Sequence, residues 1–291
     1  MRALPLLFLL PAMALAQAPK TAPASSVGGA HVTRGLNNPE CILWDAVGKC
    51  WYVSNLAGGS TARDSRAFIS KLDADGKVLE KEWVKGLDAP KGMGLSGRML
   101  YVADIDHVSV IDIQKGQFVR RIPVQGAKFL NDIAVSAKGE LYVSDMERSV
   151  IYRIGPTSRP EVFVSDKKLE CPNGLWMEPD SLIVAAWGTI TGDNFATKVP
   201  GRLLRVDLRT KRISAVTPKP LGNLDGLVKS GAHYYASDYK AGKVFKVAED
   251  GGPSLWKSGF MAAADMGLDK DRKILAIPDM AAGTITFVPL D

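Results

Sequence analysis

Six short motifs each place a polar side chain directly after a proline, leucine or alanine. The six polar residues are Glu40, Lys91, Asn131, Asn173, Asp225 and Asp265. Carboxylate and amide oxygens are hard ligands, so Glu, Asn and Asp together suit Ca²⁺, Mg²⁺ or Mn²⁺ better than they suit a thiolate-bound metal. Taken singly, an Asn or Asp before Gly is more often a turn former than a ligand. Four such residues at equivalent points of a repeat favour a site.

The repeat that carries these residues is a short apolar phrase that occurs six times. The six copies begin at Tyr52, Tyr101, Tyr142, Leu182, Tyr235 and Leu275. An apolar run and a turn precede each phrase, and a period-2 segment such as Val150-Ile-Tyr-Arg-Ile154 follows it. Each unit of about 40 to 50 residues is typical of a four-stranded antiparallel meander. We therefore predict an all-β fold, a six-bladed β-propeller with four-stranded blades, rather than a β-sandwich with accidental similarity.

The propeller explains why the polar residues recur once per unit. The first strand of each blade lines the central channel, so six polar groups would face one axis. Such a ring is costly to bury unless something satisfies it. The last unit ends at Thr284-Ile-Thr-Phe-Val288, one strand short, and a strand-like segment at 30–36 precedes the first unit. We expect this N-terminal strand to complete the last blade and so remove an exposed sheet edge.

With these motifs the chain resembles the regucalcin–gluconolactonase family, also called the senescence marker protein family, over residues 35–291. The resemblance rests on Pro39-Glu-x-x-x-Trp44, Asn131-Asp-x-x-Val-x-x-x-Gly139, Pro172-Asn-Gly-Leu175 and Asp225-Gly-Leu227. It implies that Glu40, Asn173 and Asp225 bind one divalent cation, expected to be Ca²⁺, with Mg²⁺, Mn²⁺ or Zn²⁺ as alternatives. It also implies lactone hydrolysis, in which Asp225 activates the attacking water and Asn131 contacts the substrate or metal-bound water.

The chain also departs from the family pattern. Lys128-Phe-Leu130 stands where the family carries a sugar-binding arginine, and Ser136 stands where an acidic residue is frequent. Lys91 and Asp265 add charges of opposite sign to the channel, and we assign both to substrate binding. The expected metal ligands are thus retained, whereas the residues expected to recognise a sugar are not.

Other residues are given structural or peripheral roles. The long loops 56–67 and 188–201 are expected to rim the mouth that carries the metal. Aspartates that end the second strands are expected to cap loops through hydrogen bonds to the backbone; these are Asp104, Asp145, Asp238 and Asp279. Four tryptophans are interpreted as blade packing: Trp44, Trp51, Trp176 and Trp187.

The N-terminal segment and the composition of the chain predict where the protein is located and which partners it lacks. Residues 1–16 have the charged, apolar and A-x-A segments of an export signal, so we expect a periplasmic or secreted protein cleaved after Ala16. Residues 17–29 are expected to be a flexible leader and 30–291 the propeller domain. No later segment is apolar enough to span a membrane, and no basic run interleaved with aromatics suggests nucleic acid. Export makes one disulfide permissible among Cys41, Cys50 and Cys171.

The leading functional hypothesis is a metal-dependent hydrolase of a lactone or related ester, acting as a monomer on a small molecule. A second hypothesis, from another class, is a non-catalytic propeller that binds a ligand or protein at its mouth. A third is a purely structural calcium ion in the channel. Fold alone does not decide between them, because propellers carry many functions.

Overall fold

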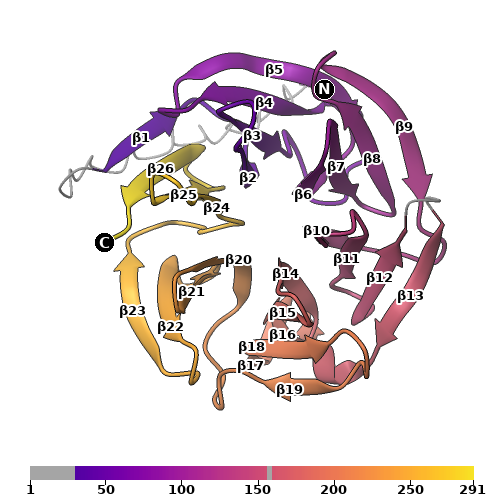
Figure 1. The fold of residues 1–291 in the computed structure, drawn as a ribbon, viewed down its shortest axis with the longest axis vertical. Helices are drawn as coiled ribbons and strands as arrows, with labels where there is room; N and C mark the ends of the chain where they lie inside the picture. The colour runs from indigo at the N-terminus through magenta and orange to yellow at the C-terminus, as the bar shows by residue number, and fades with distance from the viewer. Residues whose placement is uncertain (1–29, 156–158) are drawn as a thin grey trace, which may run out of the picture.

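The computed structural model describes residues 30–155 and 159–291. Its strands form six four-stranded antiparallel sheets and one two-stranded hairpin. The six sheets are arranged radially around a central axis, each with its first strand innermost (Figure 1). This is the predicted six-bladed β-propeller. The predicted signal peptide 1–16 and leader 17–29 lie outside the described residues.

The first three blades are continuous meanders. Blade 1 contains β2 (Pro39–Asp45), β3 (Cys50–Asn55), β4 (Ala67–Asp73) and β5 (Val78–Leu87). Blade 2 contains β6 (Pro90–Ser96), β7 (Met99–Asp104), β8 (His107–Asp112) and β9 (Gln117–Pro123). Blade 3 contains β10 (Leu130–Val135), β11 (Leu141–Asp145), β12 (Val150–Ile154) and β13 (Pro160–Ser165).

The remaining blades carry an insertion and the ring closure. Blade 4 contains β14 (Pro172–Met177), β15 (Ser181–Ala186), β18 (Leu203–Asp207) and β19 (Ile213–Ala215), with the hairpin β16 (Gly188–Gly192) and β17 (Ala196–Pro200) inserted. Blade 5 contains β20 (Leu224–Ser230), β21 (His233–Asp238), β22 (Lys243–Ala248) and β23 (Pro253–Ser258). Blade 6 contains β24 (Gly267–Asp269), β25 (Ile274–Asp279) and β26 (Thr284–Pro289).

The N-terminal strand closes the ring. β1 (His31–Arg34) pairs antiparallel with β26, with His31 opposite Phe287. The two rings stack with their centroids 4.7 Å apart. The prediction that an N-terminal strand completes the last blade is therefore confirmed, and this pairing covers the edge of β26 that would otherwise invite association with another chain.

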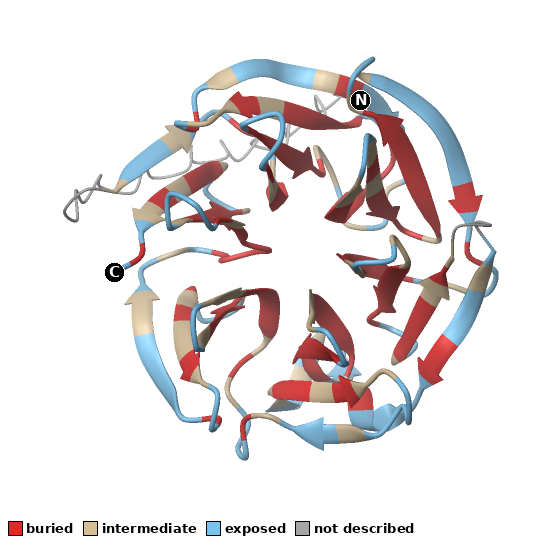
Figure 2. Ribbon diagram, in the orientation of Figure 1, coloured by how far each residue is buried: buried red, intermediate tan, exposed pale blue. Residues whose placement is uncertain are grey.

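The core is divided among the seams between blades. Alternating side chains of each blade face the next one, and a cluster of buried apolar residues fills every seam. At the closing seam, Trp51 of blade 1 packs edge-on against Phe287 of blade 6, with ring centroids 5.6 Å apart. The inner strands are mostly buried and the outermost strands are mostly exposed (Figure 2). Non-directional apolar packing thus holds each blade at a fixed angle to its neighbours.

Two expectations about the rest of the chain can be compared with the structure. All three cysteines are buried and free, so none forms a disulfide. None of the described residues belongs to a helix that is long and apolar enough to cross a membrane.

Candidate functional site

The site begins where each first strand begins. In blades 2, 3 and 6, the aspartate that ends the second strand accepts hydrogen bonds from two successive backbone N–H groups ahead of the first strand of its own blade. In blade 3, Asp145 accepts from Lys128 at 2.9 Å and Phe129 at 3.2 Å. The aspartates of blades 2 and 6 repeat the pattern. In blade 5, Asp238 accepts one such bond, from Asn223 at 3.2 Å. The predicted capping role of these four aspartates is confirmed, and it holds the segments that lead into the inner strands of blades 2, 3, 5 and 6.

A β-bulge then turns one side chain of each inner strand towards the channel. In blades 1 to 5 the strand register shifts directly after the first residue of the inner strand. Each bulge contains one predicted ring residue, which is Glu40, Lys91, Asn131, Asn173 or Asp225, and in blades 2 to 5 it also contains the next residue, which is Gly92, Asp132, Gly174 or Gly226. A bulge leaves its extra residue unpaired and re-aims its side chain. Five of the six predicted ring residues therefore owe their orientation to the same local irregularity.

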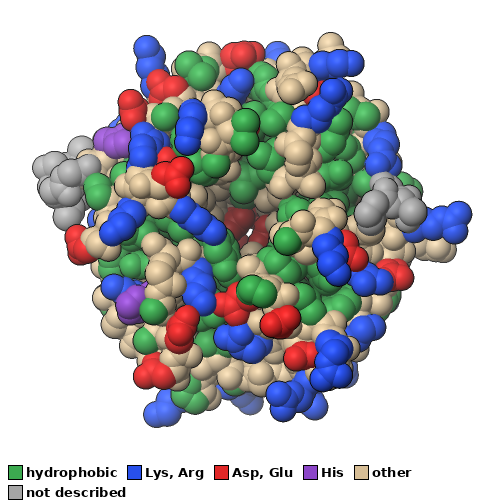
Figure 3. Space-filling model, in the orientation of Figure 1, with side chains coloured by type: hydrophobic (Ala, Val, Ile, Leu, Met, Phe, Trp, Pro, Cys, Tyr) green, Lys and Arg blue, Asp and Glu red, His purple; other side chains and the backbone are tan. Residues whose placement is uncertain are grey.

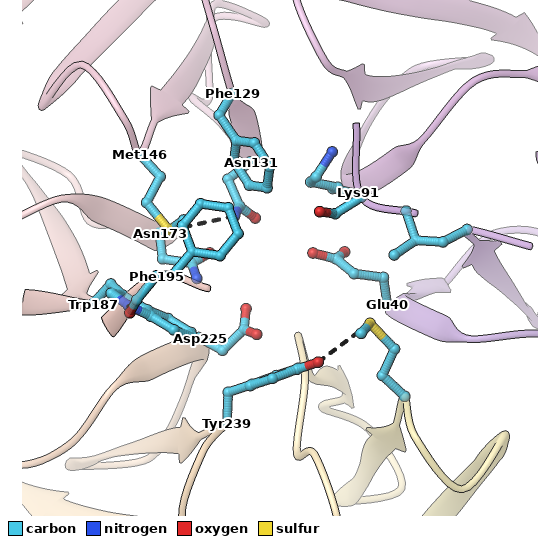
Figure 4. A pocket seen from close by; sticks show the side chains of 13 residues that line it. Glu40, Lys91, Phe129, Asn131, Met146, Asn173, Trp187, Phe195, Asp225 and Tyr239 are labelled. Atoms are coloured by element: carbon cyan, nitrogen blue, oxygen red, sulfur yellow. Dashed lines mark hydrogen bonds between the residues drawn. The ribbon is translucent and has the colours of Figure 1, made fainter. Parts of the chain in front are cut away.

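These five residues line one cavity at the mouth of the channel. The cavity encloses about 120 Å³. The carboxylates of Glu40 and Asp225 point towards its centre from different sides, and the side chains of Asn131 and Asn173 lie around the same opening (Figure 4). The space-filling view shows an opening at the middle of the ring with acidic side chains inside it (Figure 3). The structure thus brings together the three predicted ligands, the predicted Asn131 and the predicted Lys91.

The structure corrects the prediction that Asp265 is the sixth residue of the polar ring. Ser144 donates a hydrogen bond to the carbonyl of Asn173 in the next blade, and Ser237 donates in the same way to Ala264. Ala264 therefore occupies the ring position of blade 6, and Asp265 lies one residue further along the strand. The sequence interpretation chose the nearest polar residue, but the register places an alanine at that position. A one-residue offset moves a side chain to a different level of the channel.

Asp265 instead lines a second, larger cavity of about 540 Å³ on the far side of the polar ring. Asp132 and Cys41 line the same cavity. The carboxylate of Asp132 accepts one hydrogen bond from the backbone N–H of Ile133 and one from that of Leu175 in the next blade, both at 2.6 Å. Sequence analysis did not single out Asp132, although its side chain ties blade 3 to blade 4 beside the site.

Three oxygen atoms in the first cavity have no hydrogen-bond partner although they are buried. They are Glu40 Oε2, Asn173 Oδ1 and Asp225 Oδ1. Buried polar atoms are nearly always paired, so three orphans in one cavity need an explanation. No three His, Cys, Asp or Glu side chains cluster as a metal site in residues 30–155 and 159–291. The set found here differs because its third member is an amide, a group that suits a hard cation.

The electrostatics of the channel favour an added positive charge. Burial, followed by the charges of Asp225 and Asp265, raises the pKa of Glu40 well above its usual range. Burial and the charge of Asp132 raise the pKa of Asp225 to about 8. Burial lowers the pKa of Lys91 to about 8, against the attraction of Glu40. The channel holds more carboxyl groups than Lys91 can neutralise, and a cation among them would lower the carboxyl pKa values.

Lys91 is held in a fixed place within the ring. Its side chain is only 1% exposed. The ammonium donates to the carbonyl of Ala89 at 3.0 Å and lies 4.4 Å from the centroid of the Phe129 ring. A buried ammonium over an aromatic face is a stable cation–π arrangement. Lys91 therefore supplies a positive charge at the cavity wall.

A second ring of side chains was missed in the sequence. The residue that follows each second strand forms a layer next to the polar ring, and all six members are apolar or aromatic: Leu56, Ile105, Met146, Trp187, Tyr239 and Met280. Five of them, all except Ile105, line the cavity. Trp187, interpreted from the sequence as blade packing, is buried in an apolar cluster with Phe129 and Met146 and also lines the cavity. Comparing the residue directly after each repeated phrase would have revealed the layer.

The two long loops also reach the cavity, as predicted. Ser60 comes from loop 56–67, and Phe195 comes from the turn of the β16–β17 hairpin. Loop 56–67 is tethered to blade 2, because the guanidinium of Arg63 pairs with Asp106 at 2.8 Å. Both insertions therefore rim the mouth that carries the polar ring.

Comparison with known proteins supports the fold. No family model matches the chain, and no curated protein matches it. Among solved structures, a gluconolactonase from Xanthomonas campestris is 17% identical, with a TM-score of 0.67 over 91% of each chain. A virginiamycin B lyase from Staphylococcus aureus is 12% identical, with a TM-score of 0.60 over 90% of this chain and 100% of that one. A chain of the nidogen/laminin complex is 16% identical, with a TM-score of 0.61 over 78% of this chain and 93% of that one.

These identities establish a shared architecture. The chain shares its propeller fold with a gluconolactonase, a virginiamycin B lyase and a chain of the nidogen/laminin complex, so its function must be argued from the site.

Proposed function

We propose that this protein is a divalent-metal-dependent hydrolase of a lactone or related ester, of the regucalcin–gluconolactonase type. The observation that carries the proposal is the set of three buried, unpartnered oxygens in one cavity, from Glu40, Asn173 and Asp225. The same three residues are the ones that the family resemblance implies as ligands. The similarity to a gluconolactonase structure supports the reaction class.

Each residue has a role in this proposal. Glu40, Asn173 and Asp225 would hold one cation, for which we propose Ca²⁺ because the donors are carboxylate and amide oxygens. When bound, the cation supplies Lewis acidity that polarises the substrate carbonyl and stabilises the developing oxyanion. Asn131, whose side chain points into the cavity, would orient the substrate (Figure 4). Lys91 would add positive charge beside the oxyanion.

Asp225 is also the proposed general base. Its carboxylate faces the centre of the cavity, where a water molecule could approach the carbonyl carbon (Figure 4). Asp225 takes a proton from that water as the oxygen bonds to the carbonyl carbon. The ring C–O bond then breaks, and the proton passes to the departing alkoxide. The product is a hydroxy acid, and the carboxylate returns to its starting state.

We further propose that the protein acts as a monomer in the periplasm or outside the cell. The export features of residues 1–16 support this location. Mass spectrometry of the mature protein, with Gln17 expected as its first residue, tests the cleavage site.

The functional proposal is tested by titrating chelator-treated protein with metals against a panel of lactones. We expect turnover that vanishes on chelation, returns with Ca²⁺ and falls at least 100-fold in Asp225→Asn, as expected for loss of a general base. Circular dichroism confirms that the variant folds. A non-catalytic propeller would bind the ion and turn over none of the lactones with any divalent metal. A structural ion would change thermal stability alone.

A further inference from the structure

The part of the cavity above the polar ring is apolar and strongly aromatic. Phe129 and Phe195 pack with ring centroids 5.1 Å apart. Trp187 lies 6.3 Å from Phe195 and 5.8 Å from Tyr239 by the same measure. Met146 belongs to the same buried cluster. We call these five residues the aromatic wall. It forms a continuous apolar surface directly beside the proposed metal ligands.

The polar atoms of the aromatic wall, and the amide nitrogen of the neighbouring Asn131, already face other groups of the protein. The indole N–H of Trp187 donates to the backbone carbonyl of Phe195 at 2.9 Å. The hydroxyl of Tyr239 faces the sulfur of Met280 at 3.9 Å. The amide nitrogen of Asn131 faces the sulfur of Met146 at 4.0 Å. A polyhydroxylated sugar ring placed against this wall would bury hydroxyl groups with few partners, which is unfavourable.

The wall contains a residue held in an unfavourable conformation. Asn194 and Phe195, at the turn of the β16–β17 hairpin, have φ angles of 53° and 54°. The left-handed region is uncommon for an aromatic residue and persists only where the surroundings enforce it. Here two groups donate hydrogen bonds to the backbone carbonyl of Phe195: the indole N–H of Trp187 at 2.9 Å and the ammonium of Lys240 at 2.8 Å. The clamped turn keeps the Phe195 ring over the cavity.

From these observations we infer that the site selects lactones or esters that carry an apolar ring, and that Phe195 is a specificity-determining residue. The inference rests on the proposed hydrolase function. A cavity of about 120 Å³ limits the enclosed part of the substrate to roughly one small ring, since a cavity of about 150 Å³ accommodates benzene. The ring of an aryl-fused lactone would stack on the aromatic wall, while its carbonyl would face the proposed cation position between Glu40 and Asp225.

The first test compares two substrates in Ca²⁺-loaded protein. We expect kcat/KM for 3,4-dihydrocoumarin, an aryl-fused δ-lactone, to exceed that for glucono-1,5-lactone at least tenfold. Phe195→Ala should lower kcat/KM for the aryl lactone about tenfold, the scale of one lost aromatic contact with its buried area, and change that for the sugar lactone less than twofold. Phe118→Ala, on the outer strand β9, is the matched control and should change neither value. Unchanged melting temperatures would show that both variants fold.

The second test measures binding without turnover. Isothermal titration with 3,4-dihydroquinolin-2-one, the hydrolysis-resistant lactam of the same shape, should give a dissociation constant that Phe195→Ala weakens about tenfold and Phe118→Ala leaves unchanged. Efficient hydrolysis of the sugar lactone with equal or poorer use of the aryl lactone would overturn the inference and leave the hydrolase proposal standing. Lactam binding that depends on Phe195, without hydrolysis of any lactone, would support the apolar site and overturn the hydrolase. If the protein neither bound the lactam nor hydrolysed any lactone, the apolar-site inference and the hydrolase proposal would both be overturned.

Discussion

Replacing Glu40 by glutamine should make the protein more stable than wild type without calcium and less stable than wild type with calcium. The substitution keeps the shape of the side chain and removes its charge. In chelator, the wild-type protein buries this carboxyl with one oxygen unpartnered and with Asp225 and Asp265 repelling its charged form. Glutamine removes that repulsion, so the chelated variant should be about 1 kcal/mol more stable than the chelated wild type. This corresponds to a melting temperature about 2 °C higher for a chain of this size.

Calcium should change the order. At a free concentration 100 times the dissociation constant, a ligand that binds only the folded state adds about 2.7 kcal/mol, or roughly 5 °C for this chain. Glu40→Gln loses a charged ligand and should gain less than 1 °C. The melting temperatures of the two proteins should therefore cross as calcium is added.

The assay is scanning calorimetry in EDTA and across a calcium titration. Glu80→Gln, at an exposed position of the outer strand β5, is the control and should follow the wild type at every calcium concentration. An equal calcium-induced shift in Glu40→Gln and wild type would refute the assignment of Glu40 as a ligand. A lower melting temperature of the variant in EDTA would refute the argument about repulsion.

Three further predictions concern the scaffold. Burial by itself raises the pKa of Glu178, but hydrogen bonds led by Lys229 outweigh it and bring the pKa from 4.5 to about 2. Its stabilising effect is therefore complete above about pH 4.5 and lost as the pH falls through 2, so Glu178→Gln should cost about 1–2 kcal/mol in urea denaturation at pH 7, allowing for screening, and only about 0.4 kcal/mol at pH 2, where the folded-state carboxyl is half protonated. Asp145→Ala leaves three backbone N–H groups, those of Lys128, Phe129 and Arg148, without their acceptor and should cost about 2–3 kcal/mol in the same assay; a loss below 0.5 kcal/mol would contradict the capping role. Deleting residues 31–34 should expose the edge of β26 and give concentration-dependent association in size-exclusion chromatography.

The blade count and the ring closure could be predicted because each rests on local pattern. The repeated strand phrase fixes the period, and a last unit short of one strand requires a partner from elsewhere in the chain. The positions of Glu40, Asn173 and Asp225 were predictable for the same reason, since each follows a proline or leucine at the same point of its repeat. All three residues line one cavity in the structure.

The errors arose where three-dimensional register matters. Asp265 was placed in the polar ring because it is the polar residue nearest the expected point, but strand register gives that position to Ala264. That Trp187 lines the cavity in addition to packing could not be predicted, because an aromatic residue after a strand looks the same in the sequence whether it faces a seam or a cavity. The left-handed turn that places Phe195 over the mouth is formed by Asn194 and Phe195 rather than by glycine, so the sequence gives no signal for it.

The bulge at the start of the inner strand makes the site modular. Each of blades 1 to 5 delivers one polar-ring side chain to the axis, and the backbone that aims it is held by hydrogen bonds such as those of Asp145 and Ser144 in blade 3, which stay within that blade and its neighbour. Exchanging one such side chain therefore alters the chemistry of the mouth while leaving the apolar seams intact. An architecture of this kind can acquire new reactions by point substitution, without a matching loss of stability, because the residues that fold it and the residues that act are different residues.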